Sequence, residues 1–335
     1  MLKAIDVYLI TGFLGSGKTS CLNHIIKNVP SGFNVMILMN EFGSVGLDGI
    51  YLETSALNIV EVNNGSIFCA CAKTDFIRAL AEIAVKHRPD LLFIEASGVA
   101  NPRDIRKDLQ LPFFKGAFKF AKQYCLVDVE NFAQECAQFN APSYQVATAD
   151  VCVFNKCDLS TAAQVNAARQ LASRHNPGAT FVETTFGQID LTDIFPGHIQ
   201  PSVGEFPMTA AVTQAEIEAV LRGMLCDLDA ALTPPDTLVS AVYKWHGGSL
   251  AAFKNIVDQW PDTVARAKAV LRFCDAPMLR FDWVLGQYTF CGVDLDNELH
   301  KNYNSLCNCV VVLAQPEIIT AFAADTNPLL EKVAD

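Results

Sequence analysis

The chain has 335 residues, a formal net charge of −11, 51% hydrophobic residues and 18% charged residues. This length exceeds one ordinary hydrophobic core and predicts two domains. The acidic balance argues against a broad nucleic-acid surface, because phosphate binding depends on clustered lysine and arginine. The apolar runs are shorter than the roughly 20 residues of a bilayer span, so we expect no membrane segment. Because the sequence also begins without a secretory signal pattern, we expect a cytoplasmic protein.

Apolar runs alternate with helical patterns through the first two hundred residues. The runs "VYLI", "VMILM", "IVEV", "LLFIEA", "QYCLVDV", "DVCVFNK" and "TFVET" are mostly continuous, as in strands buried on both faces. Helices are predicted over 18–29 and 74–87. This alternation predicts an α/β fold over residues 1–200, with a mostly parallel sheet flanked by helices.

The stretch "GFLGSGKTS" lies between a predicted strand and a predicted helix and matches the pattern of a P-loop NTPase, G-x-x-x-x-G-K-[ST]. In such a loop, main-chain N–H groups and the helix N-terminus surround the phosphates of a nucleotide. Lys18 is expected to reach the β- and γ-phosphates, and Thr19 to bind Mg²⁺. The predicted nucleotide-binding residues here are Gly12, Gly15, Ser16, Gly17, Lys18, Thr19 and Ser20.

A second motif, "NKCD", follows an apolar strand and contains Asn155, Lys156 and Asp158. A carboxylate at Asp158 accepts hydrogen bonds from the N1–H and the exocyclic amine of guanine, whereas adenine presents the wrong donor pattern. Downstream of a P-loop, this motif favours GTP over ATP. An ATP-dependent kinase remains a further alternative.

The stretch "LLFIEASGVANP" ends a predicted strand at Glu95 and places Gly98 three residues later. We expect Glu95 to help hold Mg²⁺ and the Gly98 N–H to meet the γ-phosphate. The predicted catalytic residues are therefore Lys18, Thr19, Glu95 and Gly98. Between these motifs, "MNEFGSVGLDG" places Glu41 and Asp48 in a glycine-rich loop suited to a nucleotide-dependent switch, or else to a solvated surface loop.

The pattern changes after residue 200. An amphipathic helix is predicted over 213–232 and belongs to a linker spanning 201–236. Residues 237–335 are predicted to form a smaller C-terminal α+β domain. Its expected elements are strands around "TLVSAVYKW", "MLRFDWVL", "YTFCGV" and "CNCVVVLA", a helix from "SLAAFKNIVDQW", a helix near 296–304, and a helical or frayed tail.

Six stretches occur in an order that resembles the CobW family of P-loop GTPases: "GFLGSGKTS", "NEFGSVGLDG", "EVNNGSIFC", "EASGVANP", "CLVDVENF" and "NKCDL". The resemblance covers about 5–195 closely and the C-terminal domain loosely, where "VARAKAVLRF" is similar to a family segment. It implies a GTP-dependent metallochaperone or metal-insertion factor, with GTP and Mg²⁺ as ligands, slow intrinsic hydrolysis and a client metalloprotein such as a cobalamin-linked enzyme.

The metal-binding motif of that family is incomplete in this chain. Family members carry G-C-x-C-C after "NNG", whereas this chain has Gly65, Ser66, Ile67, Phe68 and Cys69, with a further thiol at Cys71. A serine hydroxyl is a poor ligand for a borderline metal and phenylalanine offers none. The pair Cys69 and Cys71 could still hold Zn²⁺ or Co²⁺ with ligands such as Glu41, or the two thiols could simply pack.

The other cysteines and the histidines are expected to be mainly structural. The predicted core thiols are Cys21, Cys125, Cys136, Cys152 and Cys226. A further pair, Cys307 and Cys309, is either a second metal site or part of a strand core. The six histidines are dispersed, without a metal-storing tract.

These observations leave two functions open. In the first, GTP and Mg²⁺ order the loops around 40–50 and 95–102, and hydrolysis releases a metal or a client. In the second, the chain is a GTPase adaptor for a corrinoid or other metalloenzyme and carries no metal itself. No catalytic glutamine or arginine finger is evident, so slow turnover is expected in either case. The metal, the client and the oligomeric state are left open.

Overall fold

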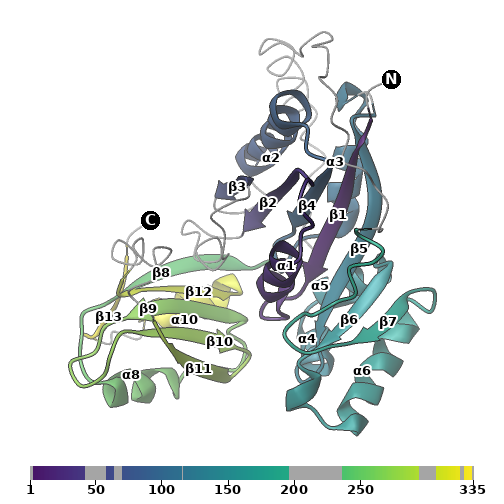
Figure 1. Ribbon diagram of the computed structural model, residues 1–335. Coiled ribbons are helices and arrows are strands. Elements are labelled where there is room, and N and C mark those ends of the chain that lie inside the picture. The colour runs from purple at the N-terminus through teal and green to yellow at the C-terminus, as the bar shows by residue number, and fades with distance from the viewer. Residues whose placement is uncertain are drawn as a thin grey trace. The chain divides into compact units, whose positions relative to one another are not determined.

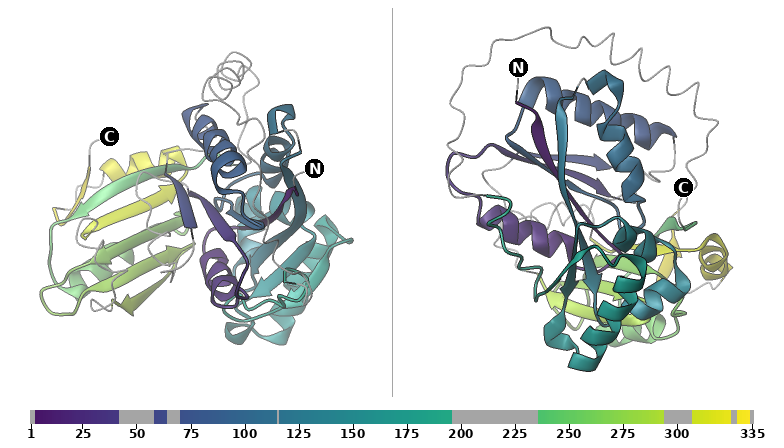
Figure 2. Two further views of the ribbon diagram at one scale, coloured as in Figure 1. Left: turned by 45° about the horizontal axis from the view of Figure 1, so that its top comes forward. Right: turned by 90° about the vertical axis from the view of Figure 1, so that its right-hand side faces the viewer.

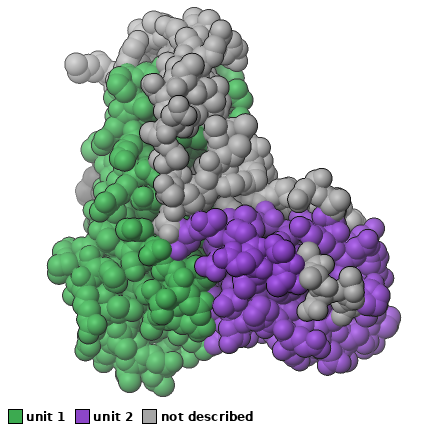
Figure 3. Space-filling view, turned by 180° about the vertical axis from the view of Figure 1, so that it is seen from behind, with its two compact units in different colours: residues 1–41, 54–235 green, residues 42–53, 236–335 purple. Residues whose placement is uncertain are grey.

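The computed structural model describes residues 3–41, 58–63, 70–114, 116–195, 236–293, 307–324 and 328–333. The chain forms two compact units, coloured separately in Figure 3. The described part of unit 1 ends at residue 195, and that of unit 2 begins at residue 236. The predicted linker helix over 213–232 and the helix near 296–304 lie outside the described residues, so these and the predicted domain boundaries stay predictions.

Unit 1 is built on a parallel sheet of seven strands in the order β3-β2-β4-β1-β5-β6-β7. This sheet confirms the α/β fold class. The strands are β1 Ile5–Gly12, β2 Val35–Glu41, β3 Asn58–Asn63, β4 Leu91–Glu95, β5 Phe118–Asp128, β6 Val151–Asn155 and β7 Thr180–Glu183.

Helices cover both faces of this sheet (Figures 1 and 2). The helices are α1 Lys18–Lys27, α2 Ala70–Glu82, α3 Pro102–Leu109, α4 Phe132–Gln138, α5 Ala141–Ala147 and α6 Ala162–His175. Shorter segments are the π-helix η2 Ile83–His87 and the 3₁₀ turns η3 Pro112–Phe114 and η4 Cys157–Leu159. Strands β4 and β6 are buried along their full length, as their unbroken apolar sequences predict.

Helix α2 begins earlier than the sequence pattern predicted. The expected start was residue 74, whereas the helix begins at Ala70. Alanine and lysine residues with good helix propensity precede the apolar face and extend the helix toward its N-terminus. As a result, Cys71 lies in the first turn of a helix and not in an extended segment.

Unit 2 contains an antiparallel sheet in the order β11-β10-β9-β12-β8-β13, with helices α8 and α10 (Figure 1). The strands are β8 Val239–Trp245, β9 Arg266–Leu271, β10 Leu279–Val284, β11 Gln287–Gly292, β12 Cys309–Ala314 and β13 Leu330–Lys332. The helices are α8 Leu250–Val257 and α10 Pro316–Ala324. The predicted C-terminal α+β domain is confirmed, although its tail forms both α10 and an edge strand.

An aromatic cluster forms the core of unit 2. Phe253 of α8 is fully buried, and its ring centroid lies 5.1 Å from those of both Trp245 and Phe281. Trp260 and Trp283 belong to the same core, so all three tryptophans of the chain are in this unit. Edge-to-face contacts of this kind add to the hydrophobic gain from burial. Tryptophan fluorescence therefore reports on unit 2.

Replacing Phe253 by alanine should destabilise unit 2 by about 3–5 kcal/mol, because the fully buried ring leaves a cavity. Urea unfolding followed by tryptophan fluorescence measures this loss. The control is Val333→Ala at a 43% exposed position, which should cost no more than about 0.5 kcal/mol. Equal midpoints for the two variants would show that the aromatic cluster does not stabilise the unit.

Candidate functional site

The P-loop follows β1 and leads into α1. Gly17 caps α1 with φ 100°, and a Cβ added there would lie 2.2 Å from Nδ2 of Asn155. Only glycine fits this position, because both the backbone conformation and the space exclude a side chain. The Lys18 ammonium donates to the carbonyls of Gly12 at 3.0 Å and Phe13 at 3.1 Å. The loop therefore closes around the lysine that phosphates would bind.

The other predicted P-loop residues differ in their exposure. Ser16 is fully buried, and within the described residues its Oγ has no hydrogen-bond partner. Gly15 has φ 80°, as a tight anion-binding loop requires. An unsatisfied buried hydroxyl beside a helix N-terminus fits a phosphate oxygen. Ser20, by contrast, is exposed in the first turn of α1, and its predicted role in nucleotide binding stays a prediction.

Thr19 and Glu95 come together from α1 and the end of β4. The Thr19 hydroxyl donates to Oε1 of Glu95 at 3.4 Å, and Glu95 is only 5% exposed. A hydroxyl and a carboxylate at one point are ligands that a hard cation such as Mg²⁺ accepts. Glu41 is the last residue of β2, two residues beyond Met39, which pairs with Glu95 in the sheet. Only the backbone position of Glu41 is described.

Gly98 lies directly against the P-loop. A Cβ added to Gly98 would come 2.5 Å from Cδ2 of Leu14 and 2.9 Å from the main-chain N of Leu14. Real Cβ atoms do not approach a backbone atom so closely, and the segment after β4 therefore needs glycine here. This packing places the predicted γ-phosphate sensor beside the phosphate loop.

Asn155 connects the second motif to the P-loop. Its Nδ2 donates to the carbonyl of Ser16 at 2.8 Å, and its Oδ1 accepts from the Gly187 N–H at 2.9 Å. The side chain is 2% exposed, so both hydrogen bonds are shielded from water. One carboxamide thus joins β6, the P-loop and the loop after β7, and the two nucleotide motifs form one site.

Lys156 and Asp158 follow Asn155 at the end of β6. Lys156 has φ 62°, and its ammonium binds Oδ2 of Asp128 at 2.6 Å. Asp128 is fully buried at the end of β5 and also accepts from the side-chain amide of Asn131 at 3.0 Å. The pair is buried on the Asp128 side only, since the Lys156 side chain is 30% exposed, and it ties Lys156 to the end of β5. Asp158 is exposed and accessible to a base.

Glu135 of α4 is a buried carboxyl behind this motif. It is 1% exposed, and within the described residues its Oε1 accepts no hydrogen bond. Burial raises the pKa of Glu135 well above its ordinary value, and the charge of Asp128 adds to this, whereas Lys156 and Lys18 oppose it. Burial at the back of the nucleotide site therefore favours the protonated form of this carboxyl.

The raised pKa of Glu135 predicts a pH dependence of stability. Between its ordinary value and its raised value, the folded protein holds a proton that the unfolded chain releases, so the free energy of unfolding falls as pH rises. In Glu135→Gln this fall should be reduced, and the two proteins should converge at pH below the ordinary value. Urea unfolding of both from pH 4 to 8 measures the difference. Glu130→Gln, at an exposed position nearby, should keep the wild-type slope, and a wild-type slope in Glu135→Gln would contradict the expectation.

The predicted transition-metal segment is only partly described. Cys69 lies outside the described residues, and Cys71 is described by its backbone position in α2. Among the described residues, no group of three histidine, cysteine, aspartate or glutamate side chains could hold a metal ion. Metal binding at Cys69 and Cys71 therefore stays a prediction.

Several of the remaining cysteines behave as core residues. Burial raises the pKa of Cys21 and Cys152 to about 12 and that of Cys136 to about 11, and the pKa of the buried Cys125 is raised as well. Such thiols stay protonated and unreactive at neutral pH. Cys226 lies outside the described residues. The predicted structural role of the four described thiols agrees with their burial.

In unit 2, the Sγ of Cys307 lies 3.8 Å from the thioether sulfur of Met278. The main chain between Cys307 and Cys309 is held by the Asn308 N–H, which donates to the carbonyl of Val270 at 2.8 Å. Two soft sulfur atoms are in contact here. A third ligand is missing within the described ranges, so the contact does not make a metal site.

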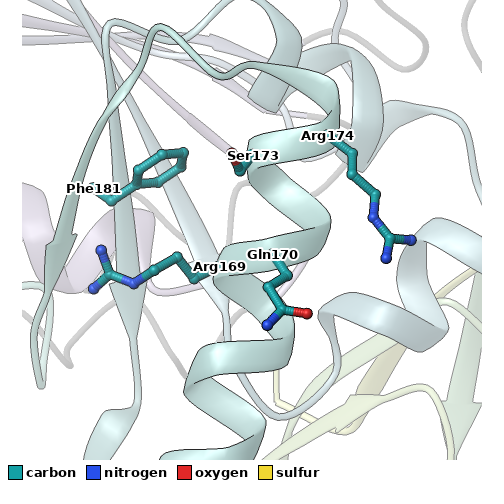
Figure 4. A pocket seen from close by; sticks show the side chains of 5 residues that line it. All are labelled: Arg169, Gln170, Ser173, Arg174 and Phe181. Atoms are coloured by element: carbon teal, nitrogen blue, oxygen red, sulfur yellow. The ribbon is translucent and has the colours of Figure 1, made fainter.

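A surface hollow of about 410 Å³ lies on α6 and β7 (Figure 4). Arg169, Gln170, Ser173, Arg174 and Phe181 line it. The guanidinium of Arg169 pairs with Glu183 and lies over the rings of Phe154 and Phe181. None of the predicted site residues lines this hollow.

In the part of the chain that the structure describes, no helix is long and apolar enough to span a membrane.

Four buried polar residues behind the site were not predicted as site residues: Asp128, Glu135, Gln123 and Gln145. Asp128 stands in the quoted stretch "CLVDVENF", where a carboxylate directly after a strand is a usable signal. Glu135 and Gln145 carry no such signal, because a polar residue in a helix usually faces solvent, and Gln123 carries none because another polar residue of its strand, Lys119, is exposed.

Three comparisons with known proteins bear on this site. The family model described as "CobW/HypB/UreG, nucleotide-binding domain" matches residues 6–183. The zinc chaperone YeiR of Escherichia coli is 28% identical over 233 residues, covering 68% of this chain and 67% of the relative. The zinc chaperone CobW of Sinorhizobium sp is 30% identical over 215 residues, covering 55% and 60%.

The crystal structure of the Zn(II)-bound YjiA GTPase from E. coli is 22% identical, covers 97% of this chain and 100% of its own, and has a TM-score of 0.41. The curated relatives are matched over about half to two thirds of their length. The family model covers more than half of the chain and includes the P-loop, the segment after β4 and the guanine motif. The chain belongs to the CobW/HypB/UreG family of nucleotide-binding proteins.

Proposed function

We propose that this protein is a GTP-dependent metallochaperone or metal-cofactor insertion factor. The observation that carries the proposal is the Asn155 carboxamide, which joins the guanine motif to the phosphate loop. Family membership supports the nucleotide, and the relatives named zinc chaperones support zinc as the metal. GTP binds and is hydrolysed, and the nucleotide state controls the delivery of metal to a client protein.

Each part of the nucleotide has a group that can hold it. When a nucleotide binds, the Lys18 ammonium replaces its hydrogen bonds to the carbonyls of Gly12 and Phe13 with hydrogen bonds to phosphate oxygens, which are negatively charged. Thr19 and Glu95 would hold Mg²⁺, which would supply charge neutralisation at the phosphates. Asp158 accepts from the guanine edge. Hydrolysis is slow in the isolated protein, since Lys18 and Gly98 stabilise charge but the sequence offers no residue that activates water.

Replacing Asp158 by asparagine should exchange guanine for xanthine as the preferred base. Xanthine has a carbonyl where guanine has its exocyclic amine, and the asparagine amide donates to that carbonyl. We expect GDP affinity to fall about 100-fold and XDP affinity to rise, as measured by calorimetry. The exposed Asp193 supplies the control variant Asp193→Asn, which should bind as wild type does. Unchanged GDP binding in Asp158→Asn would rule out the guanine assignment, and ATP preference in the wild type would favour a kinase.

The metal function rests on the segment that contains Cys69 and Cys71. Two thiols give a partial soft site that a client's ligands complete, which suits transfer better than permanent storage. The rival function, a GTPase adaptor that carries no metal, is favoured by Ser66 and Phe68 at positions where family members have cysteines. Both functions require the same nucleotide site.

Zinc binding separates the two. The double variant Cys69→Ser/Cys71→Ser should lose at least about tenfold in Zn²⁺ affinity, because hydroxyls replace thiolate ligands. The measurement is an anaerobic competition titration with a chromogenic chelator, with and without GTP. Cys274→Ser, which removes an exposed thiol elsewhere, should bind zinc as wild type does. Equal, negligible zinc binding in all three proteins would favour the adaptor.

A further inference from the structure

Gln145 of α5 holds the segment that follows β4. Its Nε2 donates to the carbonyl of Gly98 at 2.9 Å and to that of Ala100 at 3.3 Å. The side chain is fully buried, and both hydrogen bonds therefore form out of contact with water. Both of these hydrogen bonds go to one short segment, residues 98–100, which begins three residues after Glu95.

The other half of the same carboxamide is unsatisfied. Oε1 of Gln145 is buried and accepts no hydrogen bond from the described residues. A buried polar atom without a partner costs about 1–3 kcal/mol, so such atoms usually have a reason to exist. A main-chain N–H of the adjacent segment would satisfy this oxygen if the segment changed its path. The Gln145 carboxamide could therefore donate hydrogen bonds to the segment 98–100 in its present path and accept one from it in a changed path.

The position of Gln145 is rigid. Its own main-chain carbonyl accepts from Nε2 of Gln123 at 3.1 Å, and the same Nε2 lies 3.1 Å from Oγ1 of Thr11 in β1. Gln123 is also fully buried, and its Oε1 accepts from Arg106 at 2.9 Å. Helix α5 packs against β1, the strand that ends in the P-loop (Figure 1). Strand β1, which leads into the P-loop, is thus connected through Gln123 to the main chain of Gln145 and helps to position its carboxamide.

The segment held by Gln145 is also pressed against the P-loop. Gly98 leaves no room for a Cβ beside Leu14, so a small shift of residues 98–100 changes how the Gly98 N–H meets a phosphate. A nucleoside diphosphate has no γ-phosphate at this point, and a triphosphate does. A residue that fixes the path of 98–100 should therefore act more strongly on triphosphate binding than on diphosphate binding.

We propose that Gln145 is the positioning residue that sets how strongly this protein prefers GTP over GDP. The inference rests on the proposed nucleotide function and extends it to a residue outside the phosphate and guanine motifs. The two Nε2 hydrogen bonds of Gln145 hold the 98–100 segment in place for contact with the γ-phosphate. When the γ-phosphate draws this segment into a second arrangement, the Oε1 of Gln145 accepts a hydrogen bond from a main-chain N–H of the segment.

The test compares the affinities of a non-hydrolysable GTP analogue and GDP, with Mg²⁺, by calorimetry. Gln145→Met keeps the side-chain length and removes both donors, and Gln145→Asn keeps the carboxamide on a shorter side chain. In both variants we expect affinity for the analogue to fall about tenfold, while GDP affinity changes less than about twofold. Thermal unfolding of both variants shows which of them are folded, and the affinities are compared for the folded ones.

The control is Trp283→Phe, which removes a buried hydrogen bond to the carbonyl of Val264 in unit 2 and leaves the hydrogen bonds of Gln145 and of residues 98–100 in place. It should lower the unfolding temperature but keep the wild-type ratio of the two affinities. Equal losses for GDP and the analogue in the Gln145 variants, or the same change of ratio in Trp283→Phe, would overturn the inference. Failure of the wild type to bind either nucleotide would instead overturn the proposed function itself.

Discussion

The nucleotide site depends on the carboxamide of Asn155. This one side chain donates to the Ser16 carbonyl of the P-loop and accepts from the Gly187 N–H of the loop after β7. Gly17 has no Cβ because the Asn155 amide occupies that space. The conformation of the phosphate loop and the placement of the guanine motif are therefore coupled through a buried contact. A nucleotide that binds at both ends meets a site already assembled.

Behind the residues that face the nucleotide lies a second set of buried polar groups. Asp128 anchors Lys156, Gln123 links the P-loop strand to α5, and Gln145 holds the segment after β4. Buried hydrogen bonds of this kind are stronger than their exposed counterparts and leave few alternative arrangements. The segment after β4 and the guanine motif are thus both tied to neighbouring elements by hydrogen bonds from buried side chains.

The metal chemistry follows different physical rules from the nucleotide chemistry. A P-loop binds phosphate through main-chain groups and a helix N-terminus, so most side chains in it can vary. A soft metal needs particular ligand atoms, and Ser66 and Phe68 supply none. This difference allows a chain to keep its nucleotide motifs while the residues of a metal-binding motif change. A partial thiol pair is compatible with transfer to a client, because the client's ligands complete the coordination.

The sequence by itself determined the fold class and the nucleotide motifs. Continuous apolar strands alternating with helices predicted the parallel sheet, and the fixed spacings of the P-loop and "NKCD" predicted Lys18, Thr19, Asn155 and Asp158. Local periodicity and short-range spacing are properties that a linear sequence carries directly. The tertiary structure alone decided which polar side chains are buried together. Glu135 and Gln145 look like helix surface residues, and only the packing of α4 and α5 makes one a buried carboxyl with a raised pKa and the other a support for Gly98.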